Sequence, residues 1–431
     1  MSELAILGGE PVRTRPFPRW PQASDSDRRR ILEVLESGNW GGYPYPNILA
    51  DEFAQQFAAE HDAKYGACVT NGTVALVVAM QAAGVRWGDE VIVPAYTWDG
   101  TAGAVLFAGA VPVFADVDPC TYCLSVDAVR AAITPKTKAV IPVHLAMRFT
   151  DMHPLLDLAA ERGLIVIEDC AHAHGGQYKG RGAGSMGDAG CFSFQSSKTM
   201  TSGEGGAIIT NRLDLFEIVQ TLSNCGRASV TDQFKRRTVG SNHRITEFQA
   251  ALLLGQLERL AELRETRSAR AALLTEALGA IPGVQPLPPQ PALTRDMMYN
   301  YIFQYRPEDS RVHRDMFVAA LDAEGIPCDG RFYEAVYRSD LFPANAGDFP
   351  QLAGIDYKSV CCPVSERAAY EEAVWLPQFL LLGEDDDVDD IASAVQKVMR
   401  NRDALAAADR ALTGLKGMSR ADRPKIEKKN Y

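Results

Sequence analysis

Short runs rich in valine and isoleucine alternate with segments of helical spacing along the first half of the chain. The apolar runs predict strands at 90–93, 111–117, 139–143, 164–167 and 190–194. Helical segments such as Pro154–Arg162 lie between them. Apolar strands joined by helical crossovers are typical of a parallel sheet that is buried on both faces. We therefore predict an α/β fold with a mostly parallel sheet.

Further helices are predicted on either side of these strands. Apolar residues recur every three to four positions in four more segments, 25–36, 48–61, 74–83 and 212–222. In the first of these helices, Ile31, Leu32 and Leu35 share one face. A long amphipathic helix follows Glu247 and runs past Leu263, and either Ser241 or Thr246 is expected to cap it.

The pattern changes after about residue 270. A strand at 299–305 and helices at 313–324 and 388–399 indicate a smaller α+β unit. We therefore divide the chain into a large domain with an N-terminal arm (1–270), a small C-terminal domain (271–405) and a polar tail (406–431). The arm is rich in proline and arginine, and we expect it to be irregular and to lie on the surface.

Composition and charge narrow the class of protein. The chain is 46% hydrophobic and 23% charged, as in an ordinary soluble protein, and its formal net charge of -11 argues against a nucleic-acid partner. No apolar run reaches the roughly 20 residues that span a bilayer, and Met1–Leu4 lacks the features of a signal peptide, so we expect a cytoplasmic protein. Cys120 and Cys123 form a CxxC without a second Cys/His pair at zinc-like spacing, so no metal is predicted.

One lysine follows a predicted strand in a chemically suggestive context. Lys198 has hydroxyl-bearing neighbours on both sides, and the glycine-rich turn 203–206 and an apolar strand, 207–210, come after it. The strand at 164–167 is followed directly by the acids Glu168 and Asp169. A lysine that can form a Schiff base, an acid that can hold a pyridinium nitrogen, and hydroxyls that can hold a phosphate are the parts of a pyridoxal phosphate enzyme.

These side chains should meet at one edge of the sheet. Ligands of parallel sheets bind at the carboxyl ends of the strands, and 94–98, Asp169 and 193–198 all fall at or just past such ends. Asn-Gly-Thr at 71–73 opens a helix and exposes free N–H groups at the positive end of the helix dipole, which suits a phosphate. An ordinary helix cap has the same sequence pattern, so both interpretations stay open here.

Several longer motifs follow one another along the chain: WGGYP at 40–44, VPAYTW at 93–98, PVHL at 142–145, EDCAHAHG at 168–175, FSFQSSKTMTSGEGG at 192–206, NCGR at 224–227, GSNHRITE at 240–247 and PVSER at 363–367. With these motifs the sequence resembles the DegT/DnrJ/StrS family of sugar aminotransferases, which are fold-type I pyridoxal phosphate enzymes. The likeness runs from about Trp20 to Leu382. It looks nearest to the branch of glutamine:scyllo-inosose aminotransferases and 3-amino-5-hydroxybenzoate synthases.

The resemblance implies a catalytic role for two residues. Lys198 matches the lysine that binds the cofactor covalently and then moves a proton between the substrate and the cofactor. Asp169 matches the acid that faces the pyridine nitrogen and keeps the ring protonated. His172 stands beside the expected position of the cofactor's 3-oxygen, although a merely structural core histidine remains an alternative. Trp98 matches the aromatic residue that stacks on the ring.

The resemblance also implies how the phosphate is held. Gly72, Thr73 and Ser193 match the residues of the phosphate cup, which donate backbone N–H and hydroxyl groups. Asn242 matches an asparagine that reaches the phosphate of the partner subunit's cofactor. The resemblance therefore implies a homodimer in which both subunits contribute to each active site.

Two segments depart from the family pattern. Ala146-Met147-Arg148-Phe149-Thr150 stands where the family usually has a small glycine, and Trp375-Leu376-Pro377-Gln378 stands where many members have a His-His pair. Larger side chains in the first segment could reshape the pocket of the amino acceptor. The departures bear on the substrate and not on the cofactor.

The sequence therefore predicts a pyridoxal 5'-phosphate-dependent aminotransferase. It would move an amino group from glutamine or glutamate to a keto-cyclitol or ketosugar in aminocyclitol or aminosugar biosynthesis. Three alternatives stay open to different degrees. An enzyme similar to 3-amino-5-hydroxybenzoate synthase shares nearly every motif. Sugar dehydratases of the family carry histidine in place of the lysine, so Lys198 argues against that activity. A pyridoxal phosphate-binding protein without turnover is the third alternative.

Overall fold

The computed structural model describes residues 3–42, 45–227, 238–307 and 311–412. Its centre is a seven-stranded sheet in the order β1-β9-β8-β5-β4-β2-β3. All pairs from β8 to β3 are parallel, whereas β9 runs antiparallel to both of its neighbours. The strands are β1 Tyr65–Val69, β2 Glu90–Pro94, β3 Val111–Ala115, β4 Thr137–Val140, β5 Ile165–Asp169, β8 Ala189–Ser193 and β9 Gly206–Thr210. The mostly parallel α/β sheet is thus confirmed.

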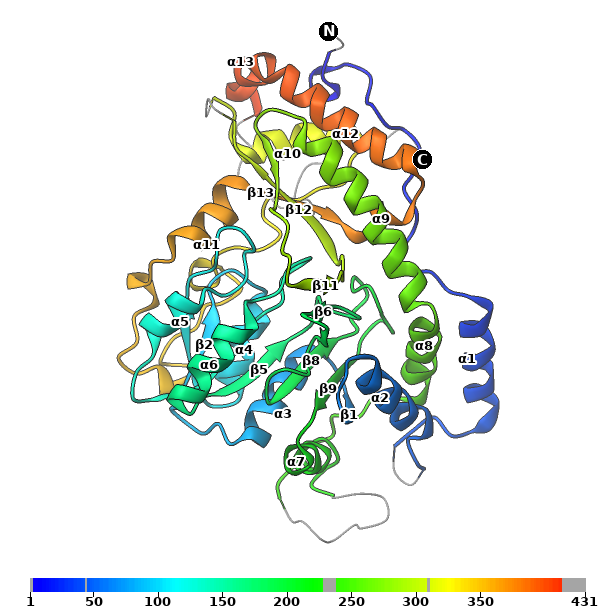
Figure 1. Cartoon of the computed structure of the whole chain (residues 1–431), viewed down its shortest axis with the longest axis vertical. Helices are drawn as coiled ribbons and strands as arrows, with labels where there is room; N and C mark the ends of the chain where they lie inside the picture. The colour runs from blue at the N-terminus through cyan, green and yellow to red at the C-terminus, as the bar shows by residue number, and fades with distance from the viewer. Residues whose placement is uncertain (1–2, 43–44, 228–237, 308–310, 413–431) are drawn as a thin grey trace.

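Helices surround this sheet, which occupies the lower half of the molecule in Figure 1. They are α1 Asp25–Ser37, α2 Ile48–Glu60, α3 Gly72–Ala83, α4 Asp99–Phe107, α5 Val126–Ala132, α6 Met152–Arg162, α7 Leu213–Ser223 and α8 Glu247–Glu258. The N-terminus of α1 is closed by a capping box between Ser24 and Asp27. Val34 of α1 is buried, whereas Leu32 and Leu35 are 54% and 51% exposed. The predicted apolar face of this helix is therefore not turned into the chain's own core.

The long helix predicted after Glu247 is two helices in the structure. α8 ends at Glu258, Arg259 is the residue between the helices, and α9 then runs over Leu260–Gly279. The Arg259 guanidinium donates to the Asp27 carboxylate at 2.6 Å and to the Gln22 carbonyl at 3.2 Å. Both partners lie far away in the sequence, so local helical spacing gave no sign of the break. Thr246, and not Ser241, caps α8, in a capping box with Gln249.

β12, β13, α10 and α12 lie above the large sheet in Figure 1, whereas α11 lies beside it, near α5. β10 Val284–Pro286, β12 Asn300–Tyr305 and β13 Ala373–Pro377 make an antiparallel sheet, and a smaller sheet joins β6 Gln177–Tyr178, β7 Arg181–Gly182 and β11 Leu293–Arg295. The helices are α10 Arg314–Ala323, α11 Pro363–Arg367, α12 Asp385–Arg400 and α13 Arg402–Leu412. Short helical turns are η1 Ala5–Leu7, η2 Val336–Arg338, η3 Pro350–Leu352, η4 Tyr357–Ser359, η5 Ala368–Glu372 and η6 Gln378–Leu382.

The predicted strand at 299–305 and the helices at 313–324 and 388–399 correspond to β12, α10 and α12. The domain limits at residues 270 and 405 stay a prediction. Residues 413–431 of the predicted polar tail lie outside the described residues, as do 43–44 of the WGGYP motif. Among the helices that the structure describes, none combines the length and the apolar character needed to cross a membrane.

The N-terminal arm is irregular, but it is anchored more firmly than we expected. Leu4 and Arg13 are buried. The main-chain N–H of Ala5 donates to the Glu324 carboxylate at 2.9 Å, and the Arg13 guanidinium donates to Asp387 at 2.7 Å. The arm expected on the surface comprises residues 8–21, and within it the expectation is wrong for Arg13, because its partner in α12 cannot be seen in local sequence.

Candidate active site

The structure places Lys198 and Asp169 together at the carboxyl edge of the sheet. Asp169 is the last residue of β5, and Lys198 lies in the turn after the neighbouring strand β8. Both residues are buried, and the Asp169 carboxylate interacts electrostatically with the Lys198 ammonium. The Lys198 Nζ also lies 4.7 Å from the centre of the Tyr299 ring.

Burial changes the chemistry of this lysine. It lowers the pKa of Lys198 to about 8, and the nearby Asp169 carboxylate opposes the shift. A desolvated ammonium is less stable than the neutral amine, so part of the Lys198 population is neutral near physiological pH. The neutral amine is the form that attacks a carbonyl carbon.

Lys198 should therefore react with an acylating reagent at lower pH than an unperturbed lysine. Only the neutral amine reacts, so its labelling rate in the cofactor-free protein should rise through a pH of about 8. A lysine model peptide in the same tube should titrate near its usual pKa of about 10.4. Labelling with isotopic acetic anhydride and peptide mass spectrometry measures both. Identical profiles would contradict the desolvation of the Lys198 amine.

Asp169 is held by two donors that fix its orientation. The Thr101 hydroxyl donates to Oδ2 at 2.9 Å, and the main-chain N–H of Ala171 donates to Oδ1 at 3.1 Å. Burial raises the pKa of Asp169, and these hydrogen bonds together with the Lys198 charge oppose that shift. Thr101 lies in the first turn of α4, three residues after Trp98, and the sequence analysis did not single it out.

His172 lies in the same cluster, with its ring stacked on Tyr299 at a centroid distance of 4.1 Å. Its Nδ1 accepts the main-chain N–H of Ala146 at 3.2 Å, so the ring proton of the neutral form belongs on Nε2. Nε2 is 3.1 Å from the Tyr333 hydroxyl, to which it can donate. Burial lowers the pKa of His172 well below its usual value, which keeps the ring neutral.

Tyr299 and Tyr333 are site residues that sequence reasoning missed. Both come from segments beyond residue 270, and only tertiary packing brings them to the edge of the large sheet. Tyr299 directly precedes an antiparallel strand, so the rule for the carboxyl ends of parallel strands gives no signal for it.

The residues predicted to form a phosphate cup, Gly72, Thr73 and Ser193, lie close together at the N-terminus of α3. A methyl group added at Gly72 would lie 2.8 Å from the Cβ of Ser193, so the two backbones approach too closely for a side chain. The Asn71 side chain caps α3 by accepting from the main-chain N–H of Val74 at 2.8 Å. The N–H groups of Gly72 and Thr73 belong to the helix's first turn, where no intrahelical acceptor exists. An anion at this position would meet donors and the positive end of the helix dipole.

Replacing Gly72 with alanine should weaken the binding of a phosphate-bearing cofactor. The new methyl group would overlap Ser193, and relief of that contact would distort the cup. We expect the Kd for pyridoxal 5'-phosphate to rise about tenfold or more, as measured by fluorescence titration of the cofactor-free protein. Gly103→Ala on α4 is the matched control, because its methyl group would meet only Phe107, at 4.0 Å. Equal affinity in both variants would show that the cup is elsewhere.

Trp98 is the residue that directly precedes α4, and it is 51% exposed. A methyl group on Gly100 would lie 2.5 Å from the Trp98 Nε1 and 3.2 Å from the Thr73 hydroxyl, so the indole stands beside the phosphate cup. Its ring centre is 6.4 Å from that of Tyr333. An aromatic residue that is this exposed beside a buried polar cluster is available to cover a ligand.

Asn242 does not join this cluster within the chain. It pairs with Asn224 through an isolated β-bridge, and its side chain accepts the main-chain N–H of Arg244 at 3.4 Å. The residue is exposed. The structure thus brings together the other predicted site residues, and Asn242 stands apart from them.

The two segments that depart from the family pattern are both structural neighbours of the cluster. Ala146 contacts His172 through its main chain, and its φ of 54° is a left-handed conformation that favours glycine. The Arg148 guanidinium is buried and donates to the carbonyls of Leu287 and Pro288 at 3.0 and 2.9 Å. In β13, Trp375 donates to the Tyr96 hydroxyl at 2.9 Å, beneath Tyr333.

A buried group below Asp169 has the spacing of a metal site but the bonding of a structural one. His144, Glu168 and Cys170 place their ligand atoms within 4.8 Å of one another. The Glu168 carboxylate already accepts from His144 and from the main-chain N–H groups of Gly184, Met186 and Gly187. The Glu168 carboxylate thus links β5 to His144 and to the segment 184–187 by hydrogen bonds.

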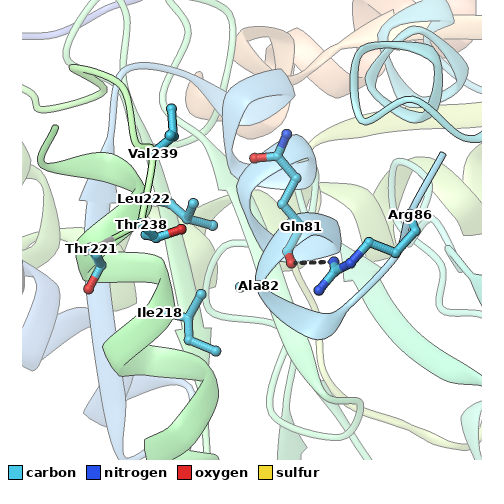
Figure 2. Close-up of a pocket in the computed structure, with 8 residues that line it drawn as sticks. All are labelled: Gln81, Ala82, Arg86, Ile218, Thr221, Leu222, Thr238 and Val239. Carbon is cyan, nitrogen blue, oxygen red and sulfur yellow. Dashed lines mark hydrogen bonds between the residues drawn. The ribbon is translucent and has the colours of Figure 1, made fainter. Parts of the chain in front are cut away.

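Figure 2 shows a separate surface cleft of about 580 Å³. It is lined by Gln81, Ala82, Arg86, Ile218, Thr221, Leu222, Thr238 and Val239. Arg86 closes one side by donating to the Gln81 carbonyl at 3.3 Å. Gln81 lies near the C-terminal end of α3, roughly 14 Å along the helix from Gly72. The cleft therefore does not belong to the Lys198 cluster.

The sequence of this chain is similar to those of known aminotransferases. Residues 21–396 match the model of the DegT/DnrJ/EryC1/StrS aminotransferase family. A protein of Streptoalloteichus tenebrarius named "Putative L-glutamine:3-amino-2,3-dideoxy-scyllo-inosose aminotransferase" is 47% identical over 413 residues, covering 94% of this chain and 99% of the relative. An L-glutamine:2-deoxy-scyllo-inosose aminotransferase of Micromonospora echinospora is 38% identical over 420 residues, covering 94% and 100%.

Solved structures show the same fold. The crystal structure of 3-amino-5-hydroxybenzoic acid synthase is similar with a TM-score of 0.80 and 34% identity, covering 90% of this chain and 100% of that one. The structure of DesI in the presence of its TDP-sugar product has a TM-score of 0.81 and 29% identity, covering 94% and 99%.

Proposed function

This chain belongs to the DegT/DnrJ/EryC1/StrS aminotransferase family and is an aminotransferase, and we propose that it uses pyridoxal 5'-phosphate to move the α-amino group of L-glutamine to a keto-cyclitol. The observation that carries the proposal is the buried Lys198–Asp169 pair beside the donor-rich start of α3. The buried amine, the oriented carboxylate and the phosphate cup together fit this cofactor.

Pyridoxal phosphate, when bound, supplies an electron-accepting ring that stabilises negative charge on the substrate's α-carbon. Lys198 would hold the cofactor through Nζ and would carry the proton removed from the substrate's α-carbon. Asp169, oriented by Thr101 and Ala171, would supply the negative charge that favours a protonated ring nitrogen. Trp98 would cover the bound cofactor and limit access of water, and the Tyr333 hydroxyl, which accepts from His172, keeps its own proton free for donation to a ligand.

The names of the similar proteins support both proposed substrates, the amino donor L-glutamine and a keto-cyclitol acceptor. The two named above carry L-glutamine and a scyllo-inosose derivative in their names. The higher identity is to the relative named for an acceptor that already carries an amino group, so we propose a keto-cyclitol of that class. The similarity to 3-amino-5-hydroxybenzoic acid synthase is lower, at 34% identity, and does not favour aromatisation as the outcome.

A two-step spectroscopic experiment tests this function. L-glutamine alone should discharge the absorbance of the lysine-bound cofactor, and a keto-cyclitol added afterwards should restore it. 2-Deoxy-scyllo-inosose and its 3-amino-2,3-dideoxy analogue, offered separately, would rank the acceptors. A cofactor spectrum that does not respond to glutamine or glutamate would identify a binding protein without turnover. A product that has lost water would favour the dehydrating alternative.

We further propose that the enzyme acts as a homodimer. Several large apolar side chains near the N-terminal end of the large domain are more than half exposed: Leu32, Leu35, Trp40, Tyr45 and Ile48. These residues lie on α1, in the segment after it and at the start of α2, and large exposed apolar side chains are typical of a surface that another chain covers. Asn242, which stands apart from its own chain's cluster, would then serve the partner's site.

Complementation between two weakly active variants tests the shared site. Lys198→Ala and Asn242→Ala homodimers are each expected to turn over poorly. If Asn242 serves the partner's site, a mixed dimer holds one site with both substitutions and one site with neither. Co-refolding equal amounts should therefore restore roughly a quarter of wild-type activity, because half of the dimers are mixed. No recovery in a mixture shown to contain mixed dimers would contradict the role of Asn242.

A further inference from the structure

The main chain of Lys198 is held at both of its polar atoms. Its N–H donates to the Gln195 carbonyl at 2.9 Å within the turn. Its carbonyl oxygen accepts the indole Nε1–H of Trp20 at 2.9 Å, from a residue 178 positions away in the N-terminal arm. Because the backbone sets where a side chain leaves the chain, the Trp20 bond bears on where the lysine amine points.

Trp20 is itself backed by a buried arginine. The Arg267 Cζ lies 5.0 Å from the centre of the Trp20 ring. Arg267 is a residue of α9 that is only 1% exposed; its Nε donates to the Gln378 side chain at 2.8 Å, and its Nη1 donates to the Leu263 carbonyl at 3.1 Å. The Arg267 guanidinium thus links α9 to the segment after β13 and also contacts the Trp20 indole.

No acid compensates the charge of Arg267. Among the described residues it forms no ion pair, and its Nη2 has no hydrogen-bond partner. Burial lowers the pKa of Arg267 to about 9. An unpaired buried guanidinium is costly, and the face of an indole ring is the aromatic surface that stabilises a cation best. The contact therefore ties Arg267 and Trp20 to each other.

The arm is also fixed on both sides of Trp20. The Gln22 carbonyl accepts from Arg259 at 3.2 Å, at the junction of α8 and α9. Ahead of Trp20, the Arg13 guanidinium donates to Asp387 of α12. Trp20 therefore sits on a segment with little freedom to withdraw from the lysine turn.

We propose that Trp20 is a positioning residue for Lys198: its indole N–H, held in place by Arg267, fixes the carbonyl of the lysine and so the direction of the amine. The effect on turnover rests on the proposed function, whereas the effect on the amine of the cofactor-free protein does not. Trp20 acts through Lys198 and is not itself a catalytic residue.

The test removes the N–H and keeps the ring. Trp20→Phe should lower kcat for the amine transfer from glutamine about five- to tenfold, with the KM for glutamine within about twofold of wild type. In the cofactor-free protein, the labelling profile of Lys198 should move to higher pH by about half a unit or more, because a less fixed amine meets more water. Trp87→Phe is the control, since Trp87 is 65% exposed and lies against the turn at Gly109.

If Trp20→Phe does not fold, the isosteric analogue β-(3-benzothienyl)alanine at position 20, which replaces only the N–H by sulfur, should give the same changes in kcat and in the Lys198 labelling profile. Arg267→Met should also lower kcat, and its combination with Trp20→Phe should lower kcat no further than the larger single effect. A wild-type labelling profile for Lys198 in the Trp20 variants would overturn the proposal, as would fully additive losses. If wild-type protein takes no amine from glutamine, the proposed function fails, and the labelling profiles still decide the role of Trp20.

Discussion

Lys198→Ala is expected to lower kcat by about 10⁴-fold or more. The substitution removes both the amine that holds the cofactor and the base that moves the α-proton, and a positioned base alone contributes about 10²- to 10⁴-fold. The cofactor's phosphate can still bind at the start of α3, so affinity should fall far less than turnover. Rate measurements with L-glutamine and the keto-cyclitol, beside a cofactor titration, separate the two effects.

Lys358→Ala serves as its control, because Lys358 is an exposed lysine in η4 on the surface of the molecule. It should keep wild-type turnover. Both variants should keep the wild-type circular dichroism spectrum. Turnover by Lys198→Ala within tenfold of wild type would exclude Lys198 as the catalytic lysine.

Asp169→Asn is expected to lower kcat by about 10²- to 10³-fold. The asparagine keeps the shape and can still accept the Ala171 N–H, but it removes the negative charge that holds a proton on the cofactor's ring nitrogen. The loss should appear in kcat for both half-reactions, because both need the same electron-accepting ring. Stopped-flow absorbance with glutamine, and then with the keto-cyclitol, measures each step.

Asp157→Asn, an exposed position on α6, controls for the substitution itself and should leave both half-reactions unchanged. A loss confined to one half-reaction of Asp169→Asn would assign Asp169 to substrate recognition. Wild-type rates in both would remove it from the mechanism.

Much of the fold could be predicted because its signal is local. The inner strands β2 and β5 contain runs of valine and isoleucine, and the structure shows the burial that such runs imply. β1 escaped prediction because its sequence, Tyr-Gly-Ala-Cys-Val, has no such run and the strand sits at the sheet's edge. The break at Arg259 escaped prediction because the partners that hold this residue, Asp27 and Gln22, lie far away in the sequence.

The residues of the candidate site also fall into two groups, those that a local pattern predicts and those that only tertiary packing brings there. Lys198 and Asp169 meet because parallel strands bring their carboxyl ends to one edge, a rule that needs only the order of strands. Thr101, Tyr299 and Tyr333 reach that edge through the packing of α4 and of segments after residue 270, which no local pattern specifies. The exposed leucines of α1 had the spacing of a core face, and sequence alone does not distinguish a face that packs inside the chain from one that packs against another chain.

The most direct test of the account follows the nitrogen itself. The enzyme, loaded with pyridoxal 5'-phosphate, is given L-glutamine labelled with ¹⁵N at the α-amino group, together with 3-amino-2,3-dideoxy-scyllo-inosose, and the product is weighed by mass spectrometry. We predict a diamine in which one nitrogen is ¹⁵N and from which no water has been lost. An unlabelled product, or no aminated product with any keto-cyclitol offered, would contradict the transfer from glutamine through Lys198.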